Sequence, residues 1–141
     1  MYEENIGYYI SIIYRHMQIQ LNKKLKIFKI GSGQYMYFIH ISYNEGITQK
    51  ELSQNLAIDK GTTAKAIKKL IEQGYLYYKV NPNDERSFYL YLTKEGKKIL
   101  PRVQKILGEV SEAFKIGMNS SEKAMAISSL KKITKNIVEQ I

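Results

Sequence analysis

The sequence predicts a mainly α-helical chain of the α+β class with one small β-hairpin. Apolar residues recur every three or four positions over long stretches at both ends of the chain, which is the period of helices with one buried side. Between these stretches, residues 75–92 contain two β-rich runs around a turn-forming cluster. With 141 residues, the chain is long enough to bury one core.

The composition is basic and lacks cysteine. The net charge of +9 favours a polyanionic partner, nucleic acid first and anionic membrane second, although Lys, Ile, Asn and Tyr are also abundant in proteins of AT-rich genomes. Without cysteine, disulfides and thiolate metal sites are excluded. The acidic start, MYEEN, does not fit a secretory signal, and no apolar run approaches the roughly 20 residues that span a bilayer. We therefore expect a cytoplasmic protein without membrane contact.

The N-terminal segment from Asn5 to Phe28 is predicted to be one long helix. Its wide apolar stripe indicates more than one packing neighbour, and a second subunit can be one of them. Gly31 and Gly33 break this helix, and Ser32 is expected to cap the next one, which runs from Gln34 to Tyr43. The inward face of that second helix is expected to consist of Tyr35, Phe38, Ile39 and Ser42.

Residues 48–75 predict two short helices joined by a tight turn. Thr48 and Glu51 form a capping box, Asp59 supplies a second N-cap, and Gly74 a C-terminal stop. On the second helix, one face is apolar: Thr63, Ile67, Leu70 and Ile71. The opposite face comprises Thr62, Lys65 and Lys69, flanked by Gly61, Lys68 and Glu72. Such a helix suits a DNA major groove, but the same pattern also suits a solvated surface.

The next segments complete a winged helix-turn-helix. Residues 75–80 and 88–92 are predicted strands, with residues 81–86 as a polar loop. Thr93 is the expected N-cap of a long helix that ends near Gly117 and contains Pro101. Asn119 and Glu122 begin a last helix. Its apolar seam is expected to comprise Ala126, Leu130, Ile133, Ile137 and Ile141. Residues 30–96 would form the DNA-binding lobe, with residues 1–29 and 97–141 as dimerisation helices.

A further pattern of residues runs through these elements: Gln34, Glu51-Leu52, Ile58-Asp59-Lys60, Thr62, Lys65, Ile67, Leu70, Gly74-Tyr75-Leu76, Asp84, Arg86, Leu92, Thr93 and Gly96. This pattern and the order of the elements resemble the multiple-antibiotic-resistance-regulator (MarR) family of bacterial transcription factors, over essentially the whole chain. Two positions depart from the pattern: Glu85 stands where the family often has an arginine, and Gly61 where it often has a serine. The wing contact with DNA is therefore expected to be weaker.

The resemblance implies a sequence-specific regulator of transcription that binds double-stranded DNA. A homodimeric repressor on a palindromic operator is expected. The expected DNA-binding residues are Gln49, Lys60, Gly61, Thr62, Lys65, Lys68, Lys69 and Arg86. Thr62 and Lys65 would lie nearest the base edges, and Lys68 and Lys69 would hold phosphates. Arg86 would enter the minor groove or, alternatively, pair with Asp84 in a solvated turn. Lys60 lies near the buried side and can instead extend along the surface.

The resemblance also implies release of DNA by a small aromatic ligand. Helix position suggests pocket residues Tyr9, Ile13, His16, Met17, Tyr35 and Tyr37, although ordinary core or dimer packing is the favoured explanation for the tyrosines.

Three alternatives to a MarR-like regulator are an enzyme, a protein-binding module and a regulator of another family. The sequence gives no support for an enzyme, because it has no glycine-rich phosphate loop, nucleophile elbow or His–carboxylate cluster. No cofactor and no metal are expected, since His16 and His40 have no ligand partners at suitable spacing. A winged helix used only for protein–protein contact, or a winged-helix regulator of another family, would share the same elements.

Overall fold

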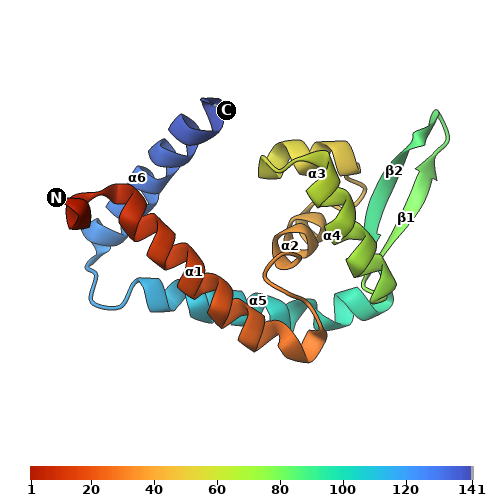
Figure 1. Ribbon diagram of the computed structural model, residues 1–141. Coiled ribbons are helices and arrows are strands. Elements are labelled where there is room, and N and C mark those ends of the chain that lie inside the picture. The colour runs from red at the N-terminus through yellow and green to blue at the C-terminus, as the bar shows by residue number, and fades with distance from the viewer. Residues whose placement is uncertain (141) are drawn as a thin grey trace. The chain divides into compact units, whose positions relative to one another are not determined.

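A computed structural model describes residues 1–140 and confirms a mainly helical chain with a two-stranded antiparallel hairpin, as in a winged helix (Figure 1). The elements, in chain order, are η1 (Tyr2–Glu4), α1 (Ile6–Leu25), η2 (Lys26–Phe28), α2 (Tyr35–Tyr43), α3 (Gln49–Leu56), α4 (Lys60–Glu72), β1 (Leu76–Asn81), β2 (Asp84–Leu92), α5 (Lys94–Phe114) and α6 (Ser120–Glu139). They divide into two compact units, Met1–Val110 and Ser111–Ile141. Ile141 of the expected C-terminal seam lies outside the described residues.

The core of the first unit joins the helix-turn-helix to the end of α1 and the first half of α5. Its buried members include Leu21 and Leu25 of α1, Leu52 of α3, Leu70 of α4 and Val103 of α5. The strands add Leu76, Leu90 and Leu92. The first half of α1 remains largely exposed, because its apolar side chains find few neighbours in this unit. This part of α1 is therefore available to another surface.

The second helix differs from the prediction in its cap and in its buried face. Gln34, not Ser32, precedes α2, and it makes no side-chain capping bond. The Ser32 backbone N–H instead donates to Asn22 Oδ1 at 2.7 Å. The buried residues of α2 are Tyr37, Phe38 and Ile41, whereas Tyr35, Ile39 and Ser42 are half-buried. The buried face differs from the expected one since α2 packs against β2 as well as against α3 and α4.

The other predicted capping residues are confirmed. Thr48 and Glu51 exchange both bonds of a capping box at the start of α3, and Asp59 Oδ1 accepts from the Thr62 N–H at the start of α4. Gly74 has the left-handed φ of +84° that ends the α4 segment, where a side chain would be strained. In the second unit, Asn119 and Glu122 form the capping box of α6.

The wing is a longer and tighter hairpin than the sequence suggested. β2 begins at Asp84, so that most of the expected loop, residues 81–86, belongs to the strands, and the turn is confined to Pro82 and Asn83. The Asn81 side chain accepts from the Asn83 N–H at 2.9 Å and stabilises this turn. The outer half of the wing is exposed on its apolar side, including Tyr78, Val80 and Phe88.

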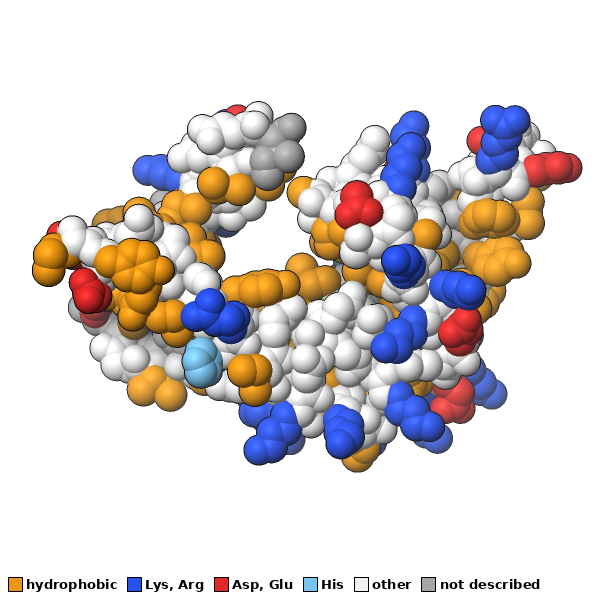
Figure 2. Space-filling model, viewed as in Figure 1, with side chains coloured by type: hydrophobic (Ala, Val, Ile, Leu, Met, Phe, Trp, Pro, Cys, Tyr) orange, Lys and Arg blue, Asp and Glu red, His pale blue; other side chains and the backbone are white. Residues whose placement is uncertain are grey.

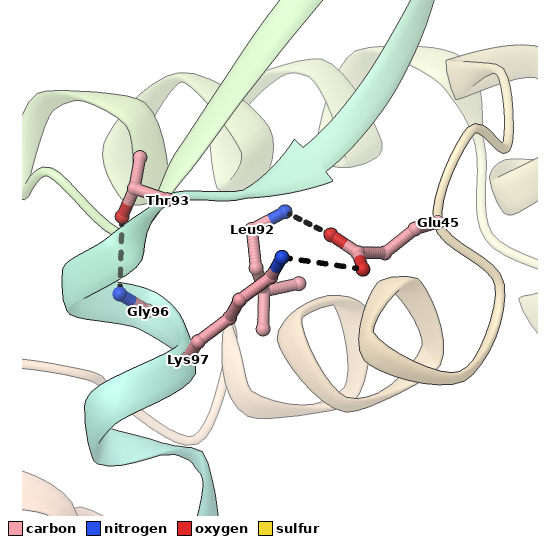
Figure 3. A network of polar contacts seen from close by, with 5 residues as sticks. All are labelled: Glu45, Leu92, Thr93, Gly96 and Lys97. Atoms are coloured by element: carbon pink, nitrogen blue, oxygen red, sulfur yellow. Dashed lines mark hydrogen bonds and ion pairs between the residues drawn. The ribbon is translucent and has the colours of Figure 1, made fainter.

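The base of the wing is fixed to the loop between α2 and α3. The Leu92 N–H donates to Glu45 Oε1 at 2.9 Å, and Lys97 Nζ lies 4.0 Å from the other carboxylate oxygen (Figure 3). The Gly46 N–H donates to the Leu90 carbonyl, and the Leu90 N–H donates to the Ile47 carbonyl. Glu45 and its neighbours therefore set the position of the wing relative to the helix-turn-helix.

The transition from β2 to α5 is equally constrained. Thr93 Oγ1 accepts from the Gly96 N–H at 3.0 Å, which confirms it as the N-cap of α5, and donates to the Gly74 carbonyl. Gly96 packs directly against backbone, since a Cβ there would lie 2.3 Å from the Tyr75 carbonyl oxygen. Within residues 1–140, no helix combines the length and hydropathy of a membrane span.

Candidate nucleic-acid interface

Helix α4 presents a polar face that consists mostly of lysine. Its buried side comprises Thr63, Ala66, Ile67 and Leu70. The side chains of Thr62, Lys65, Lys68 and Lys69 are exposed, as the helical period predicted, and so is that of Lys60, which the period placed near the buried side. Figure 2 shows Lys and Arg side chains over α4 and at the tip of the hairpin. A helix with this division can lie against a polyanion without exposing its apolar side.

Thr62 is anchored to the cap of α4. Its backbone N–H donates to Asp59 Oδ1 at 2.8 Å, and its hydroxyl donates to Asp59 Oδ2 at 2.7 Å. These two bonds, the backbone bond first, lower the pKa of Asp59 below its usual value of 3.8. Because the hydroxyl hydrogen is engaged, Thr62 offers a nucleic acid its methyl group and the remaining acceptor capacity of its oxygen.

The lysines of α4 are not neutralised within the described part of the chain. Ion pairs there join Lys24 to Glu109, Lys97 to Glu45 and Lys115 to Glu112, and none involves α4 or the wing. Lys60 is exposed as well. These cations are therefore available to phosphates without first breaking an ion pair.

A polar groove of about 770 Å³ lies between the start of α3, the start of α4 and the wing. Its lining includes Gln49 and Lys60, which the sequence singled out, and Lys50 and Ser87, which it did not. The Glu51 N–H is already capped by Thr48 Oγ1, whereas the Gln49 and Lys50 N–H groups before it have no acceptor inside their own helix and favour an anion at this end of the groove. Lys50 could have been found from its position in the first turn of α3, whereas Ser87 gives no signal in the sequence.

Arg86 lies at the wing side of the same groove. Its backbone N–H donates to Asp84 Oδ1 at 3.0 Å. Among residues 1–140, no carboxylate lies within 4.0 Å of the Arg86 guanidinium, so the suggested ion pair with Asp84 is wrong. Asp84 shapes the strand start through the backbone and leaves the guanidinium exposed. Glu85 is exposed beside it, at the position where the resemblance suggested a second cation.

The residues suggested for an effector pocket lie in three different environments. Tyr9, Ile13 and His16 are exposed on α1, while Met17 is half-buried and packs against the core. Tyr35 is half-buried, and burial together with the nearby Tyr14 raises its pKa. Tyr37 is buried, and its hydroxyl has no hydrogen-bond partner among the described residues. An unpaired buried hydroxyl is unfavourable, which makes Tyr37 the most informative member of this set.

No metal-binding group of three or more His, Cys, Asp or Glu side chains is present in the part of the chain that the structure describes.

Comparison with known proteins assigns the family. A family model described as the MarR family matches residues 30–87. The HTH-type transcriptional regulator YybA of Bacillus subtilis is 31% identical over 91% of this chain and 85% of its own length. The crystal structure of a MarR transcriptional regulator from Methanosarcina mazei is 37% identical, with a TM-score of 0.88 over 96% of this chain and 98% of that chain.

A second solved structure contains nucleic acid. A MarR family transcriptional regulator from Listeria monocytogenes, complexed with a 26mer DNA, is 29% identical to this chain, with a TM-score of 0.90 over 96% of this chain and 91% of that chain. Sequence and structural similarity thus extend across nearly the whole length of these regulators. The chain belongs to the MarR family of transcriptional regulators.

Proposed function

We propose that the chain is a repressor that binds a palindromic, double-stranded operator as a homodimer. The observation that carries this proposal is the row of exposed, unpaired lysines on α4, which lies beside a groove that ends at the unpaired Arg86. The DNA in the complex of the Listeria regulator supports the same partner for this chain.

Each cation has a distinct role in the proposed complex. Lys65 contacts guanine O6 or N7 in the major groove, and the Thr62 methyl contacts a neighbouring base edge, where a thymine methyl fits. Lys68 and Lys69 hold phosphates and contribute affinity without specificity. Gln49 and Lys60 contact the strand that crosses the groove, and the absence of a side chain at Gly61 permits close approach. Arg86 enters the adjacent minor groove.

The proposed dimer is formed by residues 1–29 and 97–141, with residues 30–96 as the DNA-binding lobe. Within each unit, large apolar side chains are exposed on these segments, including Ile6, Tyr9 and Ile13 on α1 and Leu130 and Ile137 on α6. Exposed apolar stripes of this extent are typical of obligate interfaces. Two-fold symmetry places two α4 helices on half-sites about one helical turn apart.

Release by a small aromatic ligand is the regulatory part of the proposal. The unpaired hydroxyl of the buried Tyr37 supports a ligand with a polar group near α2. In the Tyr37→Phe variant, loss of the hydroxyl should leave the fold intact and abolish the effect of phenols or aromatic carboxylates on DNA affinity. Unchanged ligand response in this variant would exclude Tyr37 from the pocket.

Selection of binding sites from random double-stranded DNA tests the main proposal. Wild-type protein should enrich an inverted repeat, whereas a Lys65→Ala variant should enrich it poorly or not at all. A winged helix used only for protein contact would enrich no sequence and show no salt-dependent DNA retention.

A further inference from the structure

The positive charge of the chain is concentrated away from the elements assigned to operator recognition. Residues 48–92, which contain α3, α4 and the wing, have seven Lys and Arg and five Asp and Glu. Residues 21–29 and 93–109 together have nine Lys and Arg and only two Glu. Most of the net charge of +9 therefore comes from these two short segments, which lie outside the elements assigned to operator recognition.

The two segments lie side by side in the first unit. The Arg102 guanidinium lies 4.8 Å from the centre of the Phe28 ring, and Lys24 Nζ lies 4.0 Å from Glu109 Oε2. The Tyr75 hydroxyl donates to the Phe28 carbonyl at 2.8 Å, close to the start of α5. We call the exposed Lys and Arg side chains of residues 21–29 and 93–109 the junction face. Figure 2 shows Lys and Arg side chains gathered along the lower edge, where α1 ends beside α5.

Internal ion pairs neutralise little of this charge. In residues 1–140, only Lys24 and Lys97 of the junction face have a carboxylate within 4.0 Å, and both pairs are at that limit and partly exposed. Exposed pairs of this kind contribute little to stability. Like charges at this density repel one another and disfavour the compact state, and a bound polyanion would relieve that repulsion.

We propose that the junction face binds the phosphate backbone of double-stranded DNA at a segment other than the one that α4 contacts. A second copy of the chain cannot cover this face with the same surface, because two faces of like charge would meet. Protein-binding surfaces are depleted in Lys and rely on aromatic and Arg side chains. The junction face instead has eight Lys and one Arg, and that arginine, Arg102, already packs on the Phe28 ring.

A membrane surface also fits poorly. Interfacial helices insert a continuous apolar face below their cationic residues. Within the two segments, Ile27 is the one large apolar side chain that is mostly exposed. Exposed lysine ammonium groups suit regularly spaced phosphates, which need charge and no defined pocket. The phosphates can belong to the DNA that flanks the operator or to a second duplex.

The test uses three variants of the full-length chain. The junction variant carries Lys23→Gln, Lys26→Gln, Lys98→Gln and Lys105→Gln. The matched control removes four charges from α6 by Lys123→Gln, Lys131→Gln, Lys132→Gln and Lys135→Gln. A third variant replaces the four junction lysines by arginine. Since Gln, Arg and Lys have similar helix propensities, all three should fold, which thermal unfolding verifies.

Two measurements on random-sequence DNA distinguish the sources of phosphate. The first measurement is the slope of log affinity against log salt concentration. It is made on a short duplex of roughly 25 base pairs, which just covers two half-sites, and on a duplex roughly three times longer. The second is the capture of a free labelled duplex by protein bound to a duplex on beads. Because no operator is needed, the outcome does not depend on whether a palindrome is selected.

If the junction face contacts DNA that flanks the operator, the junction variant should have a smaller salt slope on the long duplex than the α6 control. The slope should fall by about 0.9 for each phosphate that the variant no longer neutralises. Contacts with a second duplex predict loss of capture instead. In both cases the arginine variant should behave as wild type. Equal slopes and equal capture for the junction variant and the α6 control would overturn the proposal, even if operator recognition by α4 were established.

Discussion

At the scale of single residues, Asp59 links the start of α4 to the position of Thr62. Its two oxygens accept from the backbone and the hydroxyl of Thr62, which lowers its pKa in the folded protein. The resulting stabilisation is complete above the usual pKa of 3.8 and is lost as the pH falls through the lower folded value.

Replacing Asp59 by Asn should therefore flatten part of the acid dependence of stability. Asn retains the cap geometry but cannot ionise. From about pH 6 to about pH 2, the melting temperature of Asp59→Asn should fall less than that of wild type. Parallel decreases in the two proteins would show that Asp59 does not contribute to the acid dependence.

Gly96 must be glycine because the backbone of Tyr75 packs closely against it, and not because of its backbone conformation. An alanine Cβ would lie 2.3 Å from the Tyr75 carbonyl oxygen, and backbone cannot move aside as a flexible side chain can. Gly96→Ala should reduce the free energy of unfolding by about 1–3 kcal/mol. Gly108→Ala in the same helix meets open space and should increase it by about 0.5–1 kcal/mol. Denaturant titration of both variants checks the contrast, and equal effects would contradict it.

At the scale of elements, the position of the wing depends on Glu45. Its carboxylate accepts from the Leu92 N–H at the end of β2, while the outer half of the hairpin has few buried contacts. An altered base would therefore displace Arg86 at the far end. In Glu45→Ala, the Leu92 N–H loses its partner, which costs about 1–3 kcal/mol.

We expect Glu45→Ala to weaken DNA binding through Arg86. The loss should be much smaller in an Arg86→Ala background, so that the two effects are not additive in a double-mutant cycle of DNA affinities. Lys97→Ala removes the exposed pair with Glu45 but leaves the Leu92 N–H its partner, so its effect on DNA affinity should be the same in the wild-type and Arg86→Ala backgrounds. Additive effects of Glu45→Ala and Arg86→Ala would show that Glu45 does not act through the wing.

The same scale explains which structural features could be predicted from the sequence. Caps at Thr48, Asp59 and Asn119 depend on neighbours three residues away, and all were identified correctly. The buried face of α2 and the length of β2 were not, because they depend on tertiary packing and on cross-strand pairing. For the groove, the exposed lysines followed from helical period, whereas the participation of Ser87 required the hairpin register.

At the scale of the whole molecule, the proposed homodimer depends on the exposed first half of α1. Ile13 is 51% exposed within its unit, although it belongs to the apolar stripe. Ile13→Glu would bury a carboxylate in the proposed interface and should raise the dimer dissociation constant more than about 100-fold. The matched control is Val80→Glu, which adds the same charge to a 50% exposed position on the wing.

Sedimentation equilibrium across a concentration series measures both variants. Val80→Glu should remain as dimeric as wild type, and Ile13→Glu should dissociate. Equal dissociation constants for Ile13→Glu and wild type would place the interface elsewhere.

The central claim is that α4 recognises an operator by contacts from Lys65, whereas Lys69 binds phosphate alone. The most direct test compares the affinities of Lys65→Ala and Lys69→Ala for a selected operator and for random DNA over a range of salt concentrations. Lys65→Ala should lose about 1–3 kcal/mol on the operator and much less on random DNA. Lys69→Ala should weaken both and lower the salt slope by about 0.9 for each phosphate that is no longer neutralised. Operator affinity of Lys65→Ala equal to that of wild type would contradict the account.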